Sequence, residues 1–216
     1  TATPERNDDG EQVLYGLLGP LCYRQDIDQM KGDILAPYVV ERLELELDED
    51  EQLAYEENRE TYKDFLREND INFSGGDGWA KFMGLVARQP NGKEAFTAYM
   101  TQRRIARSGR AKLRAIWELL QEHSNDRIII FTADNDTAYE IGRTFFLPVL
   151  THHTKMTERR EMLDMFRSGE YPVLVTSKVL NEGVDVPEAS VGIVVSGSGS
   201  IREHVQRLGR ILRKKA

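Results

Sequence analysis

The spacing of hydrophobic residues changes along the chain. From about residue 111 onward, short apolar runs alternate with segments in which apolar residues recur at helical spacing. The apolar runs are residues 127–132, 147–151, 171–177 and 190–197, and the helical segments are residues 112–123, 135–146, 157–169 and 201–214. Strands that are apolar on both faces, joined by helices of ten or more residues, are typical of a parallel sheet covered on both sides. This part of the chain therefore predicts an α/β fold, a parallel sheet sandwiched by helices.

The first part of the chain has a different pattern. Residues 38–47 alternate through Val40, Leu43 and Leu45, which predicts a strand with one buried face. Residues 48–69 open with the acidic run DEDE and continue at helical spacing; acids in a first turn favour the helix dipole, so we interpret them as structural rather than as a metal site. A glycine-broken stretch then leads to a basic segment at residues 93–112, which predicts a helix.

Charge is distributed unevenly. The 216 residues carry a formal net charge of −7, which by itself argues against binding to nucleic acid. Residues 1–70 contribute −13, residues 71–112 contribute +6, and residues 113–216 are balanced. Residues 71–110 of this positive segment are called the basic island below. This is the place where a polyanion would bind.

Composition narrows the class of protein. A single cysteine, Cys22, excludes an internal disulfide and a cysteine metal site, which suits a reducing cytoplasm. The pair His152 and His153 has no partner at metal-binding spacing, so we expect no metal ligands in this chain. No apolar run is long enough to span a membrane, and the first residues resemble neither a signal nor a transit peptide. Because they also lack an initiator methionine, we expect a piece excised from a longer protein.

One loop after an apolar run carries polar groups suited to a nucleotide or a phosphate. In VTSKVLNEGVDVPEAS, the Thr176 and Ser177 hydroxyls could donate to a phosphate oxygen, and the Asp185 carboxylate could accept from ribose hydroxyls. The turn that leads to Asp185 contains Gly183. An acidic loop with ordinary turn chemistry remains the alternative.

A second candidate lies in HVQRLGRILRKK. Arg207, Arg210 and Arg213 stand three apart, with Gln206 one turn before Arg210. Like charges at this spacing repel unless an anion lies over them, and the planar guanidinium suits phosphate. The alternative is a basic helix end in solvent, stabilised by the helix dipole.

Taken in order, four stretches resemble conserved helicase motifs. Residues 1–6 (TATPER), 127–136 (RIIIFTADND), 173–190 and 204–214 resemble motifs III, IV, V and VI of superfamily 2 helicases. LGPLCYR, LAPY and residues 147–169 are most similar to the archaeal XPB family of DNA repair and transcription helicases. The resemblance covers nearly the whole chain.

The resemblance implies a motor of two RecA-like lobes that clamps ATP, with Mg²⁺, in the cleft between them. Residues 38–216 would be the second RecA-like lobe, with residues 71–110 as a thumb-like insertion, and residues 1–37 would be the end of the first lobe and a linker. The implied partners are DNA, the N-terminal lobe of the same polypeptide, and a nuclease or another repair or transcription protein, in the cytoplasm of an archaeal cell.

The resemblance also implies roles for individual residues. Arg210 and Arg213 match arginine fingers that reach the γ-phosphate, with Gln206 beside them and Arg207 in a lesser nucleotide or interlobe role. Thr1 and Thr3 match the motif that couples the lobes. The remaining positions are Gly183 and Asp185 near the nucleotide, Thr176 and Ser177 at the DNA backbone, and Arg103, Arg104, Arg107 and Arg110 at DNA phosphates.

The departures from the family pattern limit what this chain is expected to do alone. It contains neither the Walker A lysine nor the DExH carboxylates, which precede motif III in the family. We therefore expect the chain by itself to be unable to hydrolyse ATP. Two alternatives remain at this stage: a non-catalytic RecA-like module that binds a repair or transcription partner, and a lobe of a restriction or remodelling translocase.

Overall fold

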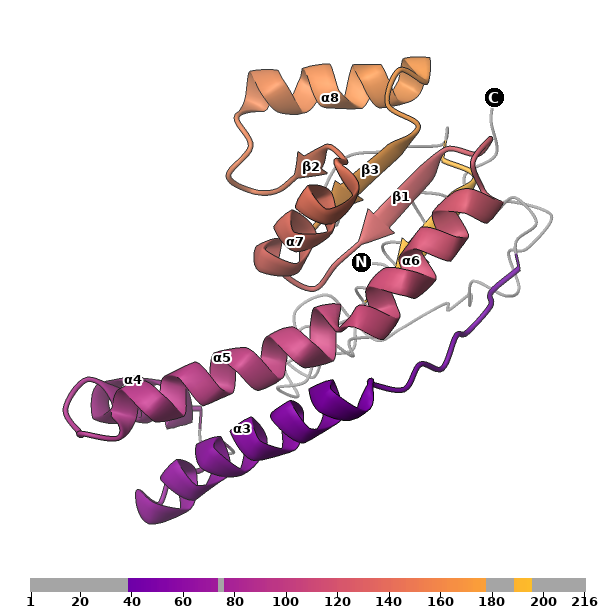
Figure 1. The fold of residues 1–216 in the computed structure, drawn as a ribbon. Helices are drawn as coiled ribbons and strands as arrows, with labels where there is room; N and C mark the ends of the chain where they lie inside the picture. The colour runs from indigo at the N-terminus through magenta and orange to yellow at the C-terminus, as the bar shows by residue number, and fades with distance from the viewer. Residues whose placement is uncertain (1–38, 74–75, 178–188, 196–216) are drawn as a thin grey trace, which may run out of the picture. The chain divides into compact units, whose positions relative to one another are not determined.

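The computed structural model describes residues 39–73, 76–177 and 189–195 (Figure 1). They belong to two compact units. Residues Glu44–Trp117 form one, called the helical unit, and the described residues 39–43, 118–177 and 189–195 belong to the other, called the sheet unit. Helix α6 (Arg110–Glu122) begins in the helical unit and ends in the sheet unit.

The sheet unit is built on four parallel strands. They are β1 (Ile128–Phe131), β2 (Val149–Leu150), β3 (Val173–Thr176) and β4 (Val191–Val194), in the order β2-β3-β1-β4. Strand β1 is central, and Ile129 lies opposite Leu174 of β3 on one side and Gly192 of β4 on the other. This arrangement confirms the predicted α/β fold with a parallel sheet.

The strand order determines which face each connecting helix covers. The connection from β1 to β2 runs through α7 (Asn135–Phe145), and the connection from β2 back to β3 runs through α8 (Met156–Ser168). These two crossovers travel in opposite directions along the sheet. Because parallel crossovers are right-handed, α7 and α8 must cover opposite faces, which gives the predicted sandwich.

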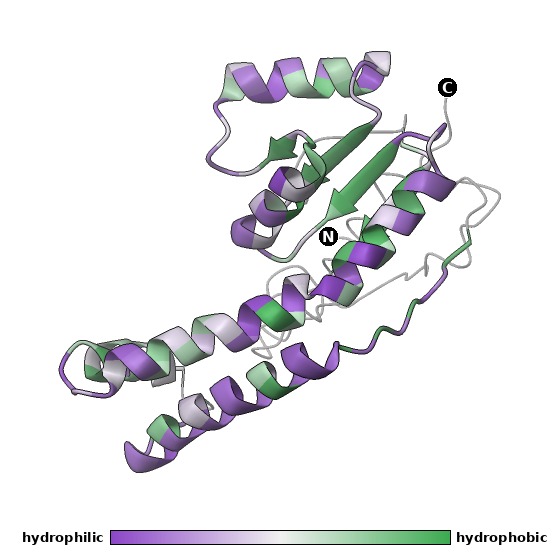
Figure 2. Ribbon diagram, in the orientation of Figure 1, coloured by the Kyte–Doolittle hydropathy of each residue, from purple (hydrophilic) through white to green (hydrophobic). Residues whose placement is uncertain are grey.

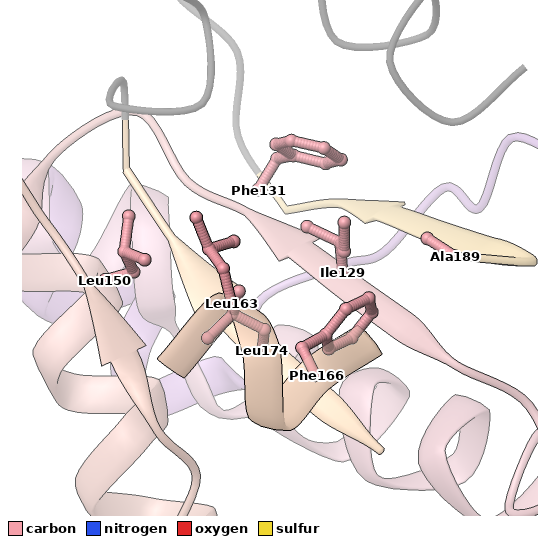
Figure 3. Close-up of a cluster of buried hydrophobic side chains, with 7 residues drawn as sticks. All are labelled: Ile129, Phe131, Leu150, Leu163, Phe166, Leu174 and Ala189. Carbon is pink, nitrogen blue, oxygen red and sulfur yellow. The ribbon is translucent and has the colours of Figure 1, made fainter. Parts of the chain in front are cut away.

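The core on the α8 face consists of alternate residues of the strands. Ile129, Phe131 and Leu174 point to the same face and meet Leu163 and Phe166 of α8 (Figure 3). Strand β1 and the first three residues of β3 are apolar (Figure 2), and Ile130 and Val175, which alternate with the residues of the α8 face, are buried as well. Burial of each such side chain contributes about 1.5–3 kcal/mol relative to exposure, which explains why the sequence pattern predicts these strands.

The helices of the sheet unit begin and end at identifiable signals. Asp134 caps α7, its carboxylate accepting a hydrogen bond from the Thr137 backbone N–H at 2.9 Å. Helix α8 ends at Gly169, whose φ of +89° is a left-handed conformation that glycine adopts without a steric penalty. The Gly169 N–H donates to the Met165 carbonyl at 3.1 Å, so the last turn is satisfied.

The helical unit has its own core. Helix α3 (Glu49–Glu68) packs along α5 (Gly92–Ser108), and the short α4 (Gly78–Val86) also contacts α5. Their shared interior is aromatic, with Phe65 and Phe82 buried at a ring separation of 5.8 Å and Tyr62 packed against them. Among the described helices, none has both the length and the hydropathy that a membrane span requires.

The predicted strand at residues 38–47 is wrong. Residues 39–48 form no strand, and the side chains of Val39, Val40, Leu43 and Leu45 are exposed. Alternation indicates a strand only where a neighbouring strand can pair with its backbone, and no described strand lies beside this segment.

Two glycines of the helical unit have roles that the sequence pattern did not reveal. The stretch interpreted as glycine-broken contains α4, whose first residue must be Gly78, because a β-carbon there would lie 2.4 Å from the Asn72 carbonyl oxygen. The predicted basic helix at residues 93–112 is two helices, since α5 ends at Ser108 and α6 starts after Gly109. The compact helical unit also extends beyond the basic island, because it includes α3.

Helix α7 approaches β2 so closely that a methyl group at Gly142 would not fit. A β-carbon there would lie 2.1 Å from Cγ2 of Val149, a short, stiff side chain. We expect Gly142→Ala to lower the free energy of unfolding of the sheet unit by about 1–2 kcal/mol, because the clash outweighs the better helix propensity of alanine. Urea unfolding followed by circular dichroism measures this change.

Two further variants test whether the clash is the cause. In Gly142→Ala/Val149→Ala, removal of the methyl groups should make the loss smaller than the sum of the two single losses by more than about 0.5 kcal/mol. At Gly84 in α4, where an added β-carbon meets nothing within 4 Å, the same substitution should not destabilise. Additive losses in the double mutant would contradict the proposed contact.

Candidate functional site

The carboxyl ends of the strands in the sheet unit carry buried hydroxyl groups. Thr132 follows β1, Thr151 follows β2, and Thr176 and Ser177 end and follow β3. All four side chains are buried. Ligands of open parallel sheets bind beyond this edge, so it is the natural candidate region in this unit.

Two of these hydroxyls, on Thr176 and Ser177, belong to residues predicted to contact a DNA backbone. The structure places them next to each other at the end of β3. The Thr176 hydroxyl donates to the Ser177 carbonyl at 3.2 Å, whereas Oγ of Ser177, in a residue 1% exposed, has no hydrogen-bond partner among the residues that the structure describes. An unpaired buried hydroxyl is unfavourable, so Ser177 is the residue at this edge with unused hydrogen-bonding capacity.

The same edge carries a cluster of polar side chains that the sequence did not predict. Asn135, the first residue of α7, lies next to His152, with 3.1 Å between Nδ2 of the amide and Nδ1 of the imidazole. The His152 and His153 rings lie with centroids 3.9 Å apart and planes tilted by 40°, and Tyr139 shares a hydrogen bond with Thr151 at 2.9 Å. The signal that could have indicated this group is the run of polar residues after each predicted strand.

The predicted basic residues Arg103, Arg104 and Arg107 lie on α5. At about 100° per residue, the three positions fall within about 100° of one another around the helix axis, so they share one side. Arg103 is held by Tyr99, one turn earlier: its guanidinium donates to the tyrosine oxygen at 2.8 Å, with the guanidinium carbon 5.7 Å from the ring centroid.

Two cations, Arg107 and Lys112, lie close to each other around the end of α5. Burial and the positive charge of Arg107 both lower the pKa of Lys112, burial being the larger cause. The Lys112 ammonium donates to the Ala106 carbonyl at 2.7 Å.

Arg110, the fourth predicted phosphate contact, has acidic partners. Its guanidinium pairs with Asp50 and lies 3.3 Å from Asp48, and its backbone N–H donates to Glu51 at 3.0 Å. Arg114 donates to Asp48 at 2.6 Å, and this hydrogen bond is the main cause that lowers the pKa of Asp48. The acidic residues at the start of α3 therefore hold the start of α6. This agrees with the interpretation of the DEDE run as structural rather than as a metal site.

The other predicted residues lie outside the described part of the chain. They are Thr1, Thr3, Gly183, Asp185, Gln206, Arg207, Arg210 and Arg213. Among the described residues, no group of three or more His, Cys, Asp or Glu side chains is arranged to hold a metal ion.

Sequence comparison relates the chain to DNA-dependent motors. Residues 111–215 match the family described as the helicase conserved C-terminal domain. The whole chain is 42% identical to a DNA 3'-5' translocase XPB2 of Sulfurisphaera tokodaii, of which it spans 49%. Over 114 residues, 52% of the chain, it is 40% identical to a DNA 3'-5' helicase XPB of Mycobacterium tuberculosis, of which it spans 21%. The chain thus spans about half of the first of these relatives and a fifth of the second.

Structural comparison supports the fold. The helicase domain of Hef from Pyrococcus furiosus resembles 97% of this chain, over 60% of its own length, with a TM-score of 0.56 at 19% identity. At that identity the likeness shows a RecA-like α/β fold and nothing further. The helicase domain match and the 42% identity along the full chain show that this chain belongs to the XPB family of superfamily 2 helicases and carries their C-terminal helicase domain.

Proposed function

We propose that the chain is the second motor lobe of an ATP-dependent DNA translocase or helicase, in which the helical unit grips DNA and the sheet unit completes the ATP site. The observation that carries the proposal is the 42% identity over all 216 residues to a protein named a DNA 3'-5' translocase. The match includes the helical unit as well as the sheet unit, so both parts would act in the motor.

The DNA-contacting role falls on α5. Arg103, Arg104 and Arg107 share one side of this helix. Phosphate contacts by Lys and Arg supply most of the sequence-independent affinity for DNA. Arg110 is left out of the proposed contact surface, because Asp48, Asp50 and Glu51 already lie beside its charge.

The sheet unit would contribute at the carboxyl edge of its strands. The Ser177 hydroxyl, which is buried and has no partner in the described part of the chain, could donate to a DNA phosphate oxygen. Thr176 stands beside it, but its hydroxyl already donates to a backbone carbonyl. Ser177 is therefore the stronger of the two proposed backbone contacts.

The nucleotide-binding role rests on the C-terminal arginines. Arg210 and Arg213 would act as arginine fingers, with Gln206 and Arg207 beside them and Gly183 and Asp185 near the nucleotide. The planar guanidinium stabilises the charge that develops on phosphoryl oxygens during transfer. ATP and Mg²⁺ would be held mainly by the N-terminal lobe, to which Thr1 and Thr3 would couple this one.

The first prediction concerns the chain alone. It contains no G-x-x-x-x-G-K-[ST] sequence to cradle the phosphates of ATP. We therefore expect the purified 216-residue chain to show no ATPase activity with or without DNA. DNA-stimulated release of phosphate by this chain would contradict the assignment of half an active site.

A second prediction concerns Arg210 and Arg213 in the full-length enzyme. Replacing either with Ala should lower kcat by about 10³- to 10⁵-fold, with a much smaller change in KM for ATP, because a finger acts on the transition state. Replacement with Lys should recover little, since a point charge does not reproduce the planar fork. Steady-state kinetics measures both parameters.

Arg207 is the internal control for the fingers. On a helix it lies about 60° from Arg210 and about 120° from Arg213, so the three cannot point equally well at one phosphate. We expect Arg207→Ala to have a smaller effect on kcat. Three equal and mild effects would mean a basic helix end and would refute the finger assignment.

A third prediction concerns the salt dependence of DNA binding. Arg104→Ala and Arg107→Ala should each remove one cation from the phosphate backbone. The magnitude of the log–log slope of affinity against salt should then fall by roughly 0.9 on duplex DNA or 0.7 on single strands for each substitution. Fluorescence anisotropy with labelled DNA at several salt concentrations measures the slope.

Arg110→Ala is the matched control, since it removes the same charge a few residues away. Its acidic partners predict an unchanged salt slope and a loss of stability of the helical unit, which circular dichroism would report. A slope that falls as much in Arg110→Ala as in Arg104→Ala would contradict the assignment of the contact surface to α5.

A further inference from the structure

An exposed tryptophan lies at the edge of the aromatic core of the helical unit. Trp79, near the start of α4, is 44% exposed. Its ring centroid is 5.3 Å from that of Tyr99 and 5.5 Å from that of Phe82. The two neighbours hold the indole on one side, while a large part of its surface faces solvent. The exposed face of the indole is therefore accessible to a ligand.

Tyr99 connects this indole to the basic side of α5. The Tyr99 ring touches Trp79, and its hydroxyl accepts the hydrogen bond from Arg103. Trp79, Tyr99 and Arg103 therefore form a continuous row of two aromatic rings and one guanidinium, called the aromatic row below. Met83 and Met100, also exposed, lie one turn after Trp79 on α4 and beside Tyr99 on α5.

The charge around the aromatic row indicates what would cover it. Residues 78–108, which include α4 and α5, carry six Lys or Arg against one Glu, a net charge of +5, whereas α3, which packs along α5, carries three against eight, a net charge of −5. The positive charge of residues 78–108 favours a polyanion as the ligand. The exposed indole of Trp79 favours a polyanion that also presents flat aromatic groups. Single-stranded nucleic acid has both properties, whereas a duplex keeps the faces of its bases stacked inside.

We propose that Trp79 stacks on an unpaired nucleobase of single-stranded DNA, with Tyr99 supporting the indole and Arg103 beside it for the adjacent phosphate or base. The proposal rests on the DNA-binding role of α5 given above and adds a contact to the bases. Tyr99 and Phe82 hold the indole before binding, so little side-chain entropy is lost when a base docks. The contact is independent of sequence, because every base offers a π face.

The expected size of the effect follows from the energy of base stacking. Alanine replacement of an aromatic residue stacked on a base weakens binding by about 5- to 150-fold. We expect Trp79→Ala in the intact 216-residue chain to weaken binding to a thymidine oligonucleotide of about 12 nucleotides to this extent. Binding to an abasic deoxyribose-phosphate strand of the same length should not change, since its phosphates are identical and it has no bases.

Conservative variants separate stacking from packing. Trp79→Leu retains apolar cover over the aromatic core but has no π face, so it should bind thymidine oligonucleotide as poorly as Trp79→Ala. Trp79→Phe should recover much of the affinity. Trp117→Leu, at the other tryptophan of the chain, which is 52% exposed on α6, should leave both affinities unchanged.

Fluorescence gives a readout that a purely structural role would not alter. In a Trp117→Phe background, Trp79 is the only tryptophan of the chain. Its emission should be quenched on addition of the thymidine oligonucleotide and unchanged on addition of the abasic strand. Stacking on a base produces this difference, and a nearby phosphate contact does not.

The outcomes distinguish this proposal from the one on which it rests. Unchanged affinity for both strands in Trp79→Ala would overturn base stacking, and it is the result expected if the aromatic row docks a protein instead. Equal losses for both strands, or Trp79→Leu binding like the unmodified chain, would also overturn it. Salt slopes unchanged in Arg104→Ala and Arg107→Ala, with base-dependent loss in Trp79→Ala, would refute the phosphate contacts of α5 and leave stacking in place.

Discussion

The sheet unit depends on β1, which is paired on both sides and buried on both faces. Its backbone bonds to β3 and β4, and its four residues are all buried. Such a strand can exist only if helices cover both faces, so α7 and α8 follow from it through the handedness of their crossovers. The same constraint brings Thr132, Thr151 and Ser177 to one edge, because parallel strands end at the same side of a sheet. The position of the proposed DNA-backbone contact is thus a consequence of the strand order.

The helical unit obeys a different constraint. Its interior is a cluster of aromatic rings contributed by α3, α4 and α5. Its arginines fall into two groups that have different neighbours. The acidic run at the start of α3 binds Arg110 and Arg114, which fixes the junction between α3 and α6. Arg103, Arg104 and Arg107, placed earlier on α5, share one side of the helix, and Arg103 contacts Tyr99 of the aromatic row. Two groups of arginines, a few residues apart, therefore have different surroundings, and charge counting alone could not separate them.

The sequence predicted the sheet unit well because its signals are local. Runs such as IIIF at residues 128–131 and VLV at residues 173–175 are apolar throughout, and this pattern is found in strands buried on both faces. The strand predicted at residues 38–47 is wrong because alternation does not reveal whether a partner strand exists. Helix α4 was missed because Gly78 was interpreted as a break, when it is required by the nearby Asn72 carbonyl. The aromatic row could not be predicted either, since Trp79 and Tyr99 meet only through the packing of α4 on α5.

The central claim is that the helical unit holds a DNA strand through the side of α5 that borders Trp79. Photochemical crosslinking of the full-length enzyme to single-stranded DNA containing 5-iododeoxyuridine, with the adducts located by mass spectrometry, tests this claim most directly. The account predicts adducts on Trp79 or Tyr99, which disappear when an excess of unmodified single strand competes. Adducts confined to residues 118–177 of the sheet unit, with none in residues 78–107, would contradict it.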